Sequence, residues 1–145
     1  MNSIVQSAGP PLVLGIAGLP GSGKTSLIAT ELGHGRHILD DINNDWTGGI
    51  AIARDVLATR RPLVISDIIF CDAVWRQRIT QELNQAVAWT YFANDPVQCV
   101  RNCTLRIRDA DSSRSIAYEI RMIEILSKIY RPAGEVRPVY RPPAG

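Results

Sequence analysis

Short apolar runs alternate with longer segments of mixed polarity along this chain. The short runs have the length and apolar content of buried strands, and the longer segments carry apolar residues at helical spacing. Strands that alternate with helices are typical of an α/β protein whose parallel sheet is covered by helices on both faces. The pattern predicts strands at 12–17, 37–40, 62–66 and 87–92, and helices at 26–32, 48–59, 72–84, 96–104 and 115–130.

The end of the chain departs from this alternation. The last predicted helix stops at Arg131-Pro132, because a proline disfavours helical backbone at the residue before it. The proline-rich tail, residues 132–145, leaves room for an edge strand at 136–140, and residues 1–10 have the character of a loose leader. We therefore predict a single domain, residues 1–145, with a parallel sheet of four to five strands. The apolar face of the last helix is expected to consist of Ile116, Ile120, Ile123, Leu126 and Ile129.

Composition narrows the class of protein. A chain of 145 residues that is 46% hydrophobic can form one well-buried core, and its net charge of +2 is too small to predict non-specific nucleic-acid binding. Cys71, Cys99 and Cys103 have neither C-x-x-C nor zinc-site spacing, so we expect reduced thiols that pack in the core. No signal peptide or membrane-length apolar run is present. We expect a cytoplasmic protein that does not associate with membranes, and nothing indicates an obligate protein partner.

One motif constrains the chemistry more than any other feature. Residues 18–25 read Gly-Leu-Pro-Gly-Ser-Gly-Lys-Thr, a full match to the phosphate-loop pattern G-x-x-x-x-G-K-[ST]. In this pattern, glycines let backbone N–H groups converge on the phosphates of a nucleotide, Lys24 reaches the β- and γ-phosphates, and the Thr25 hydroxyl binds Mg²⁺. The predicted ligands are ATP and Mg²⁺. The candidate nucleotide-binding residues are Gly18, Pro20, Gly21, Ser22, Gly23, Lys24, Thr25 and Ser26.

The surroundings of the motif support this interpretation. A strand-like run precedes it and a helical segment follows it, so the anion would lie at a helix N-terminus. A glycine-rich turn without a ligand is the alternative. Among phosphate-loop proteins, a GTPase would need an N-K-x-D motif, a transporter ATPase an L-S-G-G-Q motif, and a motor ATPase a second helical domain. The chain has neither motif and no room for that domain, which leaves a compact kinase.

Carboxylates follow two of the predicted strands. Asp40 and Asp41 end the second strand and Asp67 directly follows the third, and ligands of parallel α/β sheets lie beyond the carboxyl ends of strands. One residue of the Asp40-Asp41 pair could accept the proton of an attacking hydroxyl. Asp67 has the position of a Walker-B carboxylate, which makes it, with Thr25, a candidate metal-side residue. The alternative is that these aspartates only cap helices or turns.

Four arginines lie around a polar break at 109–113, where a small kinase would carry a lid over the nucleotide. They are Arg101, Arg106, Arg108 and Arg114. A planar guanidinium stabilises the charge that spreads over a transferring phosphoryl group better than a lysine does. We expect one of Arg106, Arg108 and Arg114 to be catalytic together with Lys24, and residues 105–115 to be mobile without ligand. A solvated run of charges is the competing interpretation.

Together these motifs resemble the kinase domain of bacteriophage polynucleotide kinase. The similarity covers about 120 residues and is carried by the phosphate loop, the Asp40-Asp41 pair, VISD at 64–67, Arg101-Asn102 and the helix end at 125–130. IIFCD at 68–72 and YFANDPVQCVRN at 91–102 also resemble small phage and bacterial kinase-like proteins of unassigned substrate. The resemblance implies a three-layer sandwich with strand order 2-3-1-4. It also implies Asp40 as general base, Asp67 on the metal side, and Arg106 or Arg108 as the lid arginine.

The sequence does not identify the molecule that accepts the phosphoryl group. Polynucleotide kinases carry an arginine that grips the acceptor just after the aspartate pair, whereas this chain has Ile42-Asn43-Asn44-Asp45 there. We predict a Mg²⁺- and ATP-dependent kinase that phosphorylates a hydroxyl of a nucleotide, a polynucleotide 5′ end or a small metabolite. The alternative from another class is a non-kinase ATP-binding module or weak ATPase in which the nucleotide orders the lid.

Overall fold

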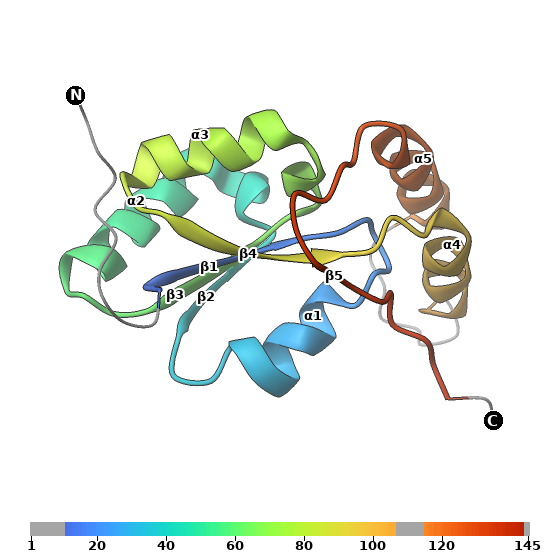
Figure 1. The fold of residues 1–145 in the computed structure, drawn as a ribbon, viewed down its shortest axis with the longest axis horizontal. Helices are drawn as coiled ribbons and strands as arrows, with labels where there is room; N and C mark the ends of the chain where they lie inside the picture. Colours follow the sequence, from blue (N-terminus) through green and yellow to red (C-terminus); the bar gives the residue numbers. More distant parts are fainter. Residues whose placement is uncertain (1–10, 107–114, 144–145) are drawn as a thin grey trace.

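The computed structural model is a five-stranded, fully parallel sheet with helices on both faces, and it describes residues 11–106 and 115–143 (Figure 1). The strand order β2-β3-β1-β4-β5 contains the predicted order 2-3-1-4 and adds an edge strand. The predicted leader and most of the predicted lid, with Arg108 and Arg114, lie outside the described residues. The strands are β1 (Val13–Ala17), β2 (His37–Asp40), β3 (Leu63–Ser66), β4 (Val87–Phe92) and β5 (Val136–Arg137).

The central strands bury side chains on both faces of the sheet. Val13 and Ala17 of β1 pack into a large cluster with α2 (Trp46–Ala58) and α3 (Ala73–Leu83), which lie on one face (Figure 1). Ile16, which points the other way, packs in a smaller cluster with α1 (Lys24–Leu27) and the helix that follows it. This two-sided burial is typical of parallel sheets and makes the three layers that the sequence predicts.

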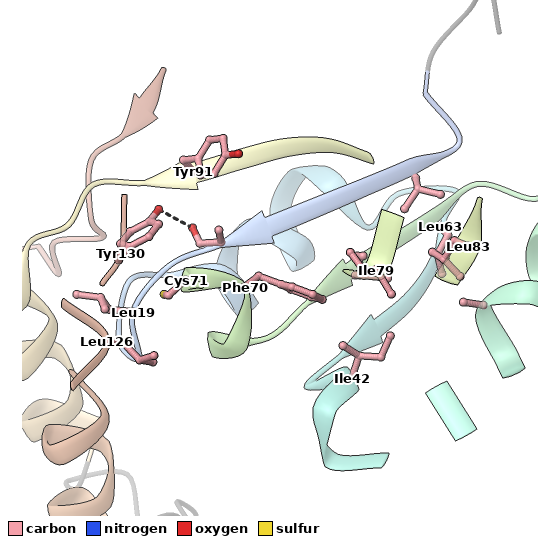
Figure 2. Close-up of a cluster of buried hydrophobic side chains, with 14 of the residues drawn as sticks. Leu19, Ile42, Leu63, Phe70, Cys71, Ile79, Leu83, Tyr91, Leu126 and Tyr130 are labelled. Atoms are coloured by element: carbon pink, nitrogen blue, oxygen red, sulfur yellow. Dashed lines mark hydrogen bonds between the residues drawn. The ribbon is translucent and has the colours of Figure 1, made fainter. Parts of the chain in front are cut away.

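The larger cluster also fixes the C-terminal part of the chain. Figure 2 shows Tyr130, which follows α5 (Ile116–Ser127), next to the carboxyl end of β1. The Tyr130 hydroxyl donates to the Ala17 carbonyl, at 3.2 Å, and lies within hydrogen-bond distance of the Phe92 carbonyl. The segment after α5 is thereby attached to the carboxyl ends of β1 and β4.

Gly15 leaves room for the Trp89 ring where β1 pairs with β4. Gly15 pairs with Trp89 in register, and a Cβ on Gly15 would lie 2.5 Å from the Trp89 ring and 2.8 Å from Val87. The indole of Trp89 makes an edge contact with Phe70 at a centroid distance of 5.1 Å. The Trp89 side chain therefore occupies the space that a larger residue at position 15 would need.

The helix after the phosphate loop, predicted over 26–32, has two parts. α1 begins at Lys24 and is followed by a π-helix, η1 (Ile28–Leu32). The backbone N–H of Gly33 donates to the Ile28 carbonyl at 2.8 Å, the five-residue spacing of a π-helix. Such turns are frequent at functional sites, and this one directly follows the helix that contains Thr25.

Capping side chains set other helix boundaries. α2 begins two residues before the prediction, because Asp45 accepts a hydrogen bond from the Gly48 N–H at 3.0 Å. α3 follows Asp72, whose carboxylate accepts from the Val74 N–H at 2.9 Å. α4 (Pro96–Leu105) has proline in its first turn, as predicted.

The last helix and the edge strand are shorter than predicted. α5 stops at Ser127, and Ile129, which we placed on its buried face, is 48% exposed because Tyr130 takes the buried position. β5 has only two residues, since Pro138 cannot donate to a strand partner. The sequence pattern missed two short 3₁₀-helices, η2 (Ile42–Asp45) and η3 (Ile68–Cys71). Among the described helices, none is long and apolar enough to cross a membrane.

Candidate active site

The phosphate loop leaves β1 at Gly18 and passes tightly over α4. Gly21 and Gly23 have φ angles of 82° and 112°, which side-chain-bearing residues rarely adopt. A Cβ on Gly21 would lie 2.6 Å from the Cys99 carbonyl oxygen and 2.8 Å from Cys103 Sγ. Both the conformation and the lack of space require glycine at position 21. The cradle of N–H groups that the motif implies at this turn stays a prediction.

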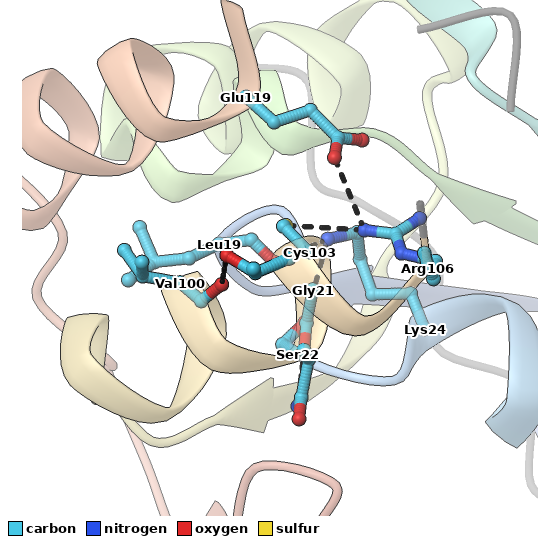
Figure 3. Close-up of polar contacts among 10 residues, drawn as sticks. Leu19, Gly21, Ser22, Lys24, Val100, Cys103, Arg106 and Glu119 are labelled. Carbon is cyan, nitrogen blue, oxygen red and sulfur yellow. Dashed lines mark hydrogen bonds and ion pairs between the residues drawn. The ribbon is translucent and has the colours of Figure 1, made fainter. Parts of the chain in front are cut away.

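Lys24 lies folded onto the loop. Its Nζ donates to the carbonyls of Gly18 at 2.8 Å and Leu19 at 2.9 Å, and to the Ser22 hydroxyl at 3.4 Å (Figure 3). Burial lowers the pKa of the Lys24 ammonium below its ordinary value, because the charged form loses its water. An anion at the loop would compensate this loss, since it would supply the missing opposite charge.

Sheet register brings a carboxylate to the start of α1. Asp40 pairs with Ser66, and Ser66 pairs with Ile16 just before the phosphate loop. The Ser66 hydroxyl donates a short hydrogen bond to Asp40 Oδ1, and the Thr25 hydroxyl donates to Asp40 Oδ2 at 3.4 Å. The two hydroxyls fix the carboxylate beside the residue that the motif assigns to Mg²⁺. The next residue, Asp41, turns the chain out of the strand with a left-handed φ of 56°.

Asp67 lies in a different environment from Asp40. It is 5% exposed, and its two oxygens accept hydrogen bonds from the backbone N–H groups of Asn43 at 2.8 Å and Ile69 at 2.9 Å. The Ile69 bond is the cap of η3. Burial raises the pKa of Asp67, because it disfavours the charged form. Asp67 therefore caps η3, and its role on the metal side stays a prediction.

Arg106, the one lid candidate among the described residues, is held by a buried glutamate. Its Nη2 lies 3.5 Å from a Glu119 carboxylate oxygen and 3.2 Å from Cys103 Sγ (Figure 3). Glu119 is 5% exposed, whereas the Arg106 side chain is 47% exposed. The pair joins the end of α4 to the first turn of α5 and turns the guanidinium toward the phosphate loop.

The C-terminal tail is bound to the phosphate loop. The Tyr140 N–H donates to the Ser22 carbonyl at 2.9 Å. The buried Asn102 amide donates to the carbonyls of Gly21, at 2.8 Å, and Tyr140, at 2.6 Å, and its oxygen accepts from Gln98 at 3.0 Å. One amide therefore connects α4, the loop and the tail.

These elements surround a cavity of about 590 Å³, the first cavity. It is large enough for a nucleotide, since ligand pockets typically have volumes of about 300–1,000 Å³. Its lining includes both acidic and basic groups at the phosphate loop. The lining residues are Pro20, Gly21, Gly23, Lys24, Thr25, Ser26, Asp40, Asp41, Ile68, Asn102, Leu105, Arg106, Glu119, Tyr140 and Pro142.

A second cavity of about 450 Å³ adjoins the first. The two share Asp41 and Ile68, so the second cavity begins beside the aspartate pair at the end of β2. η2, η3, the N-terminal end of α3 and one face of α5 form its walls. Its lining residues are Asp41, Asn43, Asn44, Asp67, Ile68, Ile69, Asp72, Trp75, Tyr118, Met122 and Leu126.

The structure brings most of the candidate residues to one space. Gly18 and Ser22 are buried inside the phosphate loop and do not line the first cavity. Asp67 lines the second cavity rather than the first. Arg101 is exposed on α4 and lines neither cavity. The candidates that line the first cavity are Pro20, Gly21, Gly23, Lys24, Thr25, Ser26, Asp40, Asp41 and Arg106.

Among the residues that line the first cavity, Glu119, Asn102 and Tyr140 make polar contacts but had no predicted role. Glu119 lies four residues before Ile123 and seven before Leu126, so its helical face marked it as buried. A buried glutamate needs a cationic or hydrogen-bonding partner, and this could have directed attention to the arginines. Asn102 and Tyr140 gave no such signal, because their role depends on contacts between distant parts of the chain.

Comparison with known proteins supports the fold. No family model matches this chain, and no curated protein matches it. Among solved structures, a gluconokinase from Sinorhizobium meliloti 1021 matches with a TM-score of 0.56 and 17% sequence identity, over 90% of this chain and 81% of that one. This neighbour does not specifically support the resemblance to phage polynucleotide kinase. The chain therefore has an α/β fold of the P-loop kinase type, with a parallel sheet of order 2-3-1-4-5.

Proposed function

We propose that this chain is a Mg²⁺- and ATP-dependent kinase that transfers the γ-phosphoryl group to a hydroxyl of a small molecule. The observation that carries the proposal is the first cavity, which is lined together by the phosphate loop with Lys24, the Asp40 carboxylate and the Arg106 guanidinium. Phosphoryl transfer needs these three kinds of group, because catalysis consists mainly of positioning and charge stabilisation. The likeness to a gluconokinase adds support at the level of the fold.

The loop residues would bind the nucleotide. Lys24 would exchange its contacts with the Gly18 and Leu19 carbonyls for phosphate oxygens, and the N–H groups of the loop would surround the β-phosphate. Thr25 and Asp67 are the proposed metal-side residues, and the hydroxyl of Thr25 suits a hard cation that prefers oxygen. Mg²⁺ at this position would neutralise phosphate charge.

Asp40 is the proposed general base. The acceptor hydroxyl attacks the γ-phosphorus, the new O–P bond forms as the bond to the ADP oxygen breaks, and the hydroxyl proton passes to Asp40. The Ser66 hydrogen bond would hold the carboxylate in one orientation during this step. Arg106, positioned by Glu119, would stabilise the charge on the transferring group.

The Asp40–Thr25 contact also suits a second assignment, in which Asp40 rather than Asp67 lies on the metal side. Two variants separate the assignments. If Asp40 is the base, Asp40→Asn abolishes turnover and keeps nucleotide affinity, whereas Asp67→Ala weakens Mg²⁺-dependent nucleotide binding. If Asp40 serves the metal, Asp40→Asn weakens Mg²⁺-dependent binding.

The function itself is tested with labelled ATP and a panel of hydroxyl compounds that includes sugars, sugar acids, nucleosides and 5′-hydroxyl oligonucleotides. We expect ADP release that depends on one class of acceptor and a labelled product. ATP binding without acceptor-dependent turnover would contradict the kinase proposal. It would instead favour an ATP-binding module or weak ATPase that acts through nucleotide-dependent ordering of the lid.

A further inference from the structure

Apolar and aromatic side chains from three elements line much of the second cavity. η3 contributes Ile68 and Ile69, α3 contributes Trp75, and α5 contributes Tyr118, Met122 and Leu126. The three residues of α5 are spaced four apart, so they form one stripe along a single face of that helix. A ligand with apolar surface of its own gains free energy in such a lining, because both surfaces leave water.

Two of these side chains carry aromatic rings that a planar ligand could contact. The Trp75 ring makes an edge contact with Trp46 at a centroid distance of 5.2 Å, and the Arg78 guanidinium lies 4.9 Å from its centroid. Tyr118 is in the first turn of α5, where its N–H donates to the Ser115 hydroxyl at 3.3 Å. Aromatic rings pair with another ring in stacked or edge-to-face contacts, which adds to the gain from buried area.

η2 adds polar groups of defined geometry to the same cavity. Asn43 and Asn44 are exposed and line it. The backbone N–H of Asn43 donates to the Asp67 carboxylate at 2.8 Å, and that of Asn44 donates to the Asp41 carbonyl at 2.9 Å, so the main chain of η2 is held in place. A side-chain amide offers donors and an acceptor together, which suits the nitrogen and oxygen atoms at the edge of a heteroaromatic ring.

The second cavity adjoins the first beside the proposed base. The two cavities share Asp41 and Ile68, and Asp40 lines the first. An acceptor hydroxyl at the Asp40 carboxylate would thus belong to a molecule whose remaining part extends past Ile68 into the second cavity. The volume of this cavity, about 450 Å³, is in the range of pockets that hold small molecules.

From this lining we propose that the second cavity holds an aromatic ring of the phosphoryl acceptor, so that the acceptor is a small hydroxyl compound joined to a planar ring, as in a nucleoside. The inference rests on the proposed kinase function and narrows it. A polyol or sugar acid without a ring would leave the apolar lining without a partner, and its hydroxyl groups would lose water there without gaining hydrogen bonds. Such compounds are therefore excluded as preferred acceptors.

Glycosides that differ in one substituent test this inference. Methyl β-D-ribofuranoside, phenyl β-D-ribofuranoside, uridine and adenosine share one ribose and differ in the group at carbon 1. Methyl and phenyl β-D-glucopyranoside form a second pair on another sugar. With the full chain and labelled ATP, we expect kcat/KM to be about tenfold or more higher for the ring compounds than for the methyl glycoside of the same sugar, because the ring buries apolar area that a methyl group lacks.

The outcomes separate the inference from the kinase proposal. If gluconate, glucitol or a methyl glycoside is phosphorylated as well as the ring compounds, the kinase proposal stands and the inference is wrong. The same holds if only a 5′-hydroxyl oligonucleotide is phosphorylated. If none of these compounds is phosphorylated, the kinase proposal fails and the inference fails with it.

A variant connects the ring preference to this cavity. Tyr118→Ala removes one aromatic side chain of the lining from a position that is 55% exposed. We expect the ratio of kcat/KM for the phenyl over the methyl glycoside to fall by about three- to thirtyfold, with ATP affinity unchanged. Tyr118→Phe keeps the ring and should keep the ratio. An unchanged ratio in Tyr118→Ala, or a loss of ATP affinity in its place, would overturn the assignment of this cavity.

Ile125→Ala is the matched control for this variant. Ile125 lies on the same helix and is 47% exposed, and it is not among the described residues that line either cavity. We expect it to leave both the ratio and the ATP affinity unchanged. An equal fall of the ratio in both variants would mean that α5 as a whole was disturbed, and the assignment of the ring to Tyr118 would be wrong.

Discussion

At the scale of single residues, two charged groups of the candidate site, the Asp40 carboxylate and the Lys24 ammonium, are positioned by neutral neighbours. Ser66 orients Asp40, and backbone carbonyls hold Lys24. The sequence predicted the charged members because each belongs to a motif or follows a strand. It did not predict most of the groups that orient them, since a serine or a main-chain carbonyl has no pattern of its own.

The phosphate loop gives the first prediction. Lys24→Ala should weaken Mg²⁺-nucleotide binding by about 1.5–3 kcal/mol, because a charge-assisted hydrogen bond to phosphate is lost. Titration calorimetry measures the affinity, and circular dichroism checks that the fold is kept. Lys128→Ala is the control, since Lys128 is exposed just after α5 and lines neither cavity. Equal affinity in both variants would rule out Lys24 as a phosphate ligand.

Arg106 gives the second prediction. Arg106→Lys keeps the charge but loses the planar fork, so turnover should fall by about a hundredfold or more with little change in stability. Glu119→Gln should also lower kcat, because the guanidinium is no longer held over the loop. Arg101→Lys serves as the control on the same helix. If Arg106→Lys turns over normally, the catalytic arginine lies elsewhere, and Arg108 and Arg114 become the candidates.

At the scale of elements, the strands were predicted more closely than the helices. The β2 and β4 strands match their predictions and β3 differs by one residue, because each is a short run with apolar residues at its centre. The sequence predicted the helix after the phosphate loop but not that its second part is a π-helix, since a π-helix has nearly the same side-chain pattern as an α-helix over five residues. The 3₁₀-helices that form a wall of the second cavity were missed because runs this short have no period.

The pairing of β1 with β4 gives the third prediction. Gly15→Ala should reduce the free energy of unfolding by about 1–3 kcal/mol, because the added methyl group would overlap the Trp89 ring. Gly134→Ala is the control, since its Cβ would be in ordinary contact at 3.8 Å from Tyr91. Urea unfolding of both variants measures the difference. Equal stability would mean that the indole can move aside without cost.

At the scale of the whole molecule, the sequence predicted the α/β class, and the resemblance implied the strand order. The placement of the tail could not be predicted, because it rests on contacts between residues far apart, such as those of Asn102 with Gly21 and of Tyr140 with Ser22. The second cavity could not be predicted either, since its lining residues come from separate segments that only the fold brings together.

The tail gives the fourth prediction. Asn102→Ala removes the amide that joins α4 to the loop and the tail, so nucleotide affinity should fall by about 1–3 kcal/mol even though the phosphates are bound by other groups. Calorimetry measures this loss. Gln77→Ala, an exposed change on α3, is the control. An affinity equal to that of the unchanged chain would show that the loop keeps its shape without the tail.

The hydrogen bond from the Tyr140 N–H to the Ser22 carbonyl has a thermodynamic consequence. If an attached tail favours the loop conformation that binds nucleotide, then bound nucleotide must favour the attached tail by the same free energy, because coupling between two sites is reciprocal. Hydrogen exchange at the Tyr140 amide would then slow as ATP saturates the chain. The tail would act as an intramolecular effector, and a protein that captured residues 136–143 would lower ATP affinity without touching the phosphates.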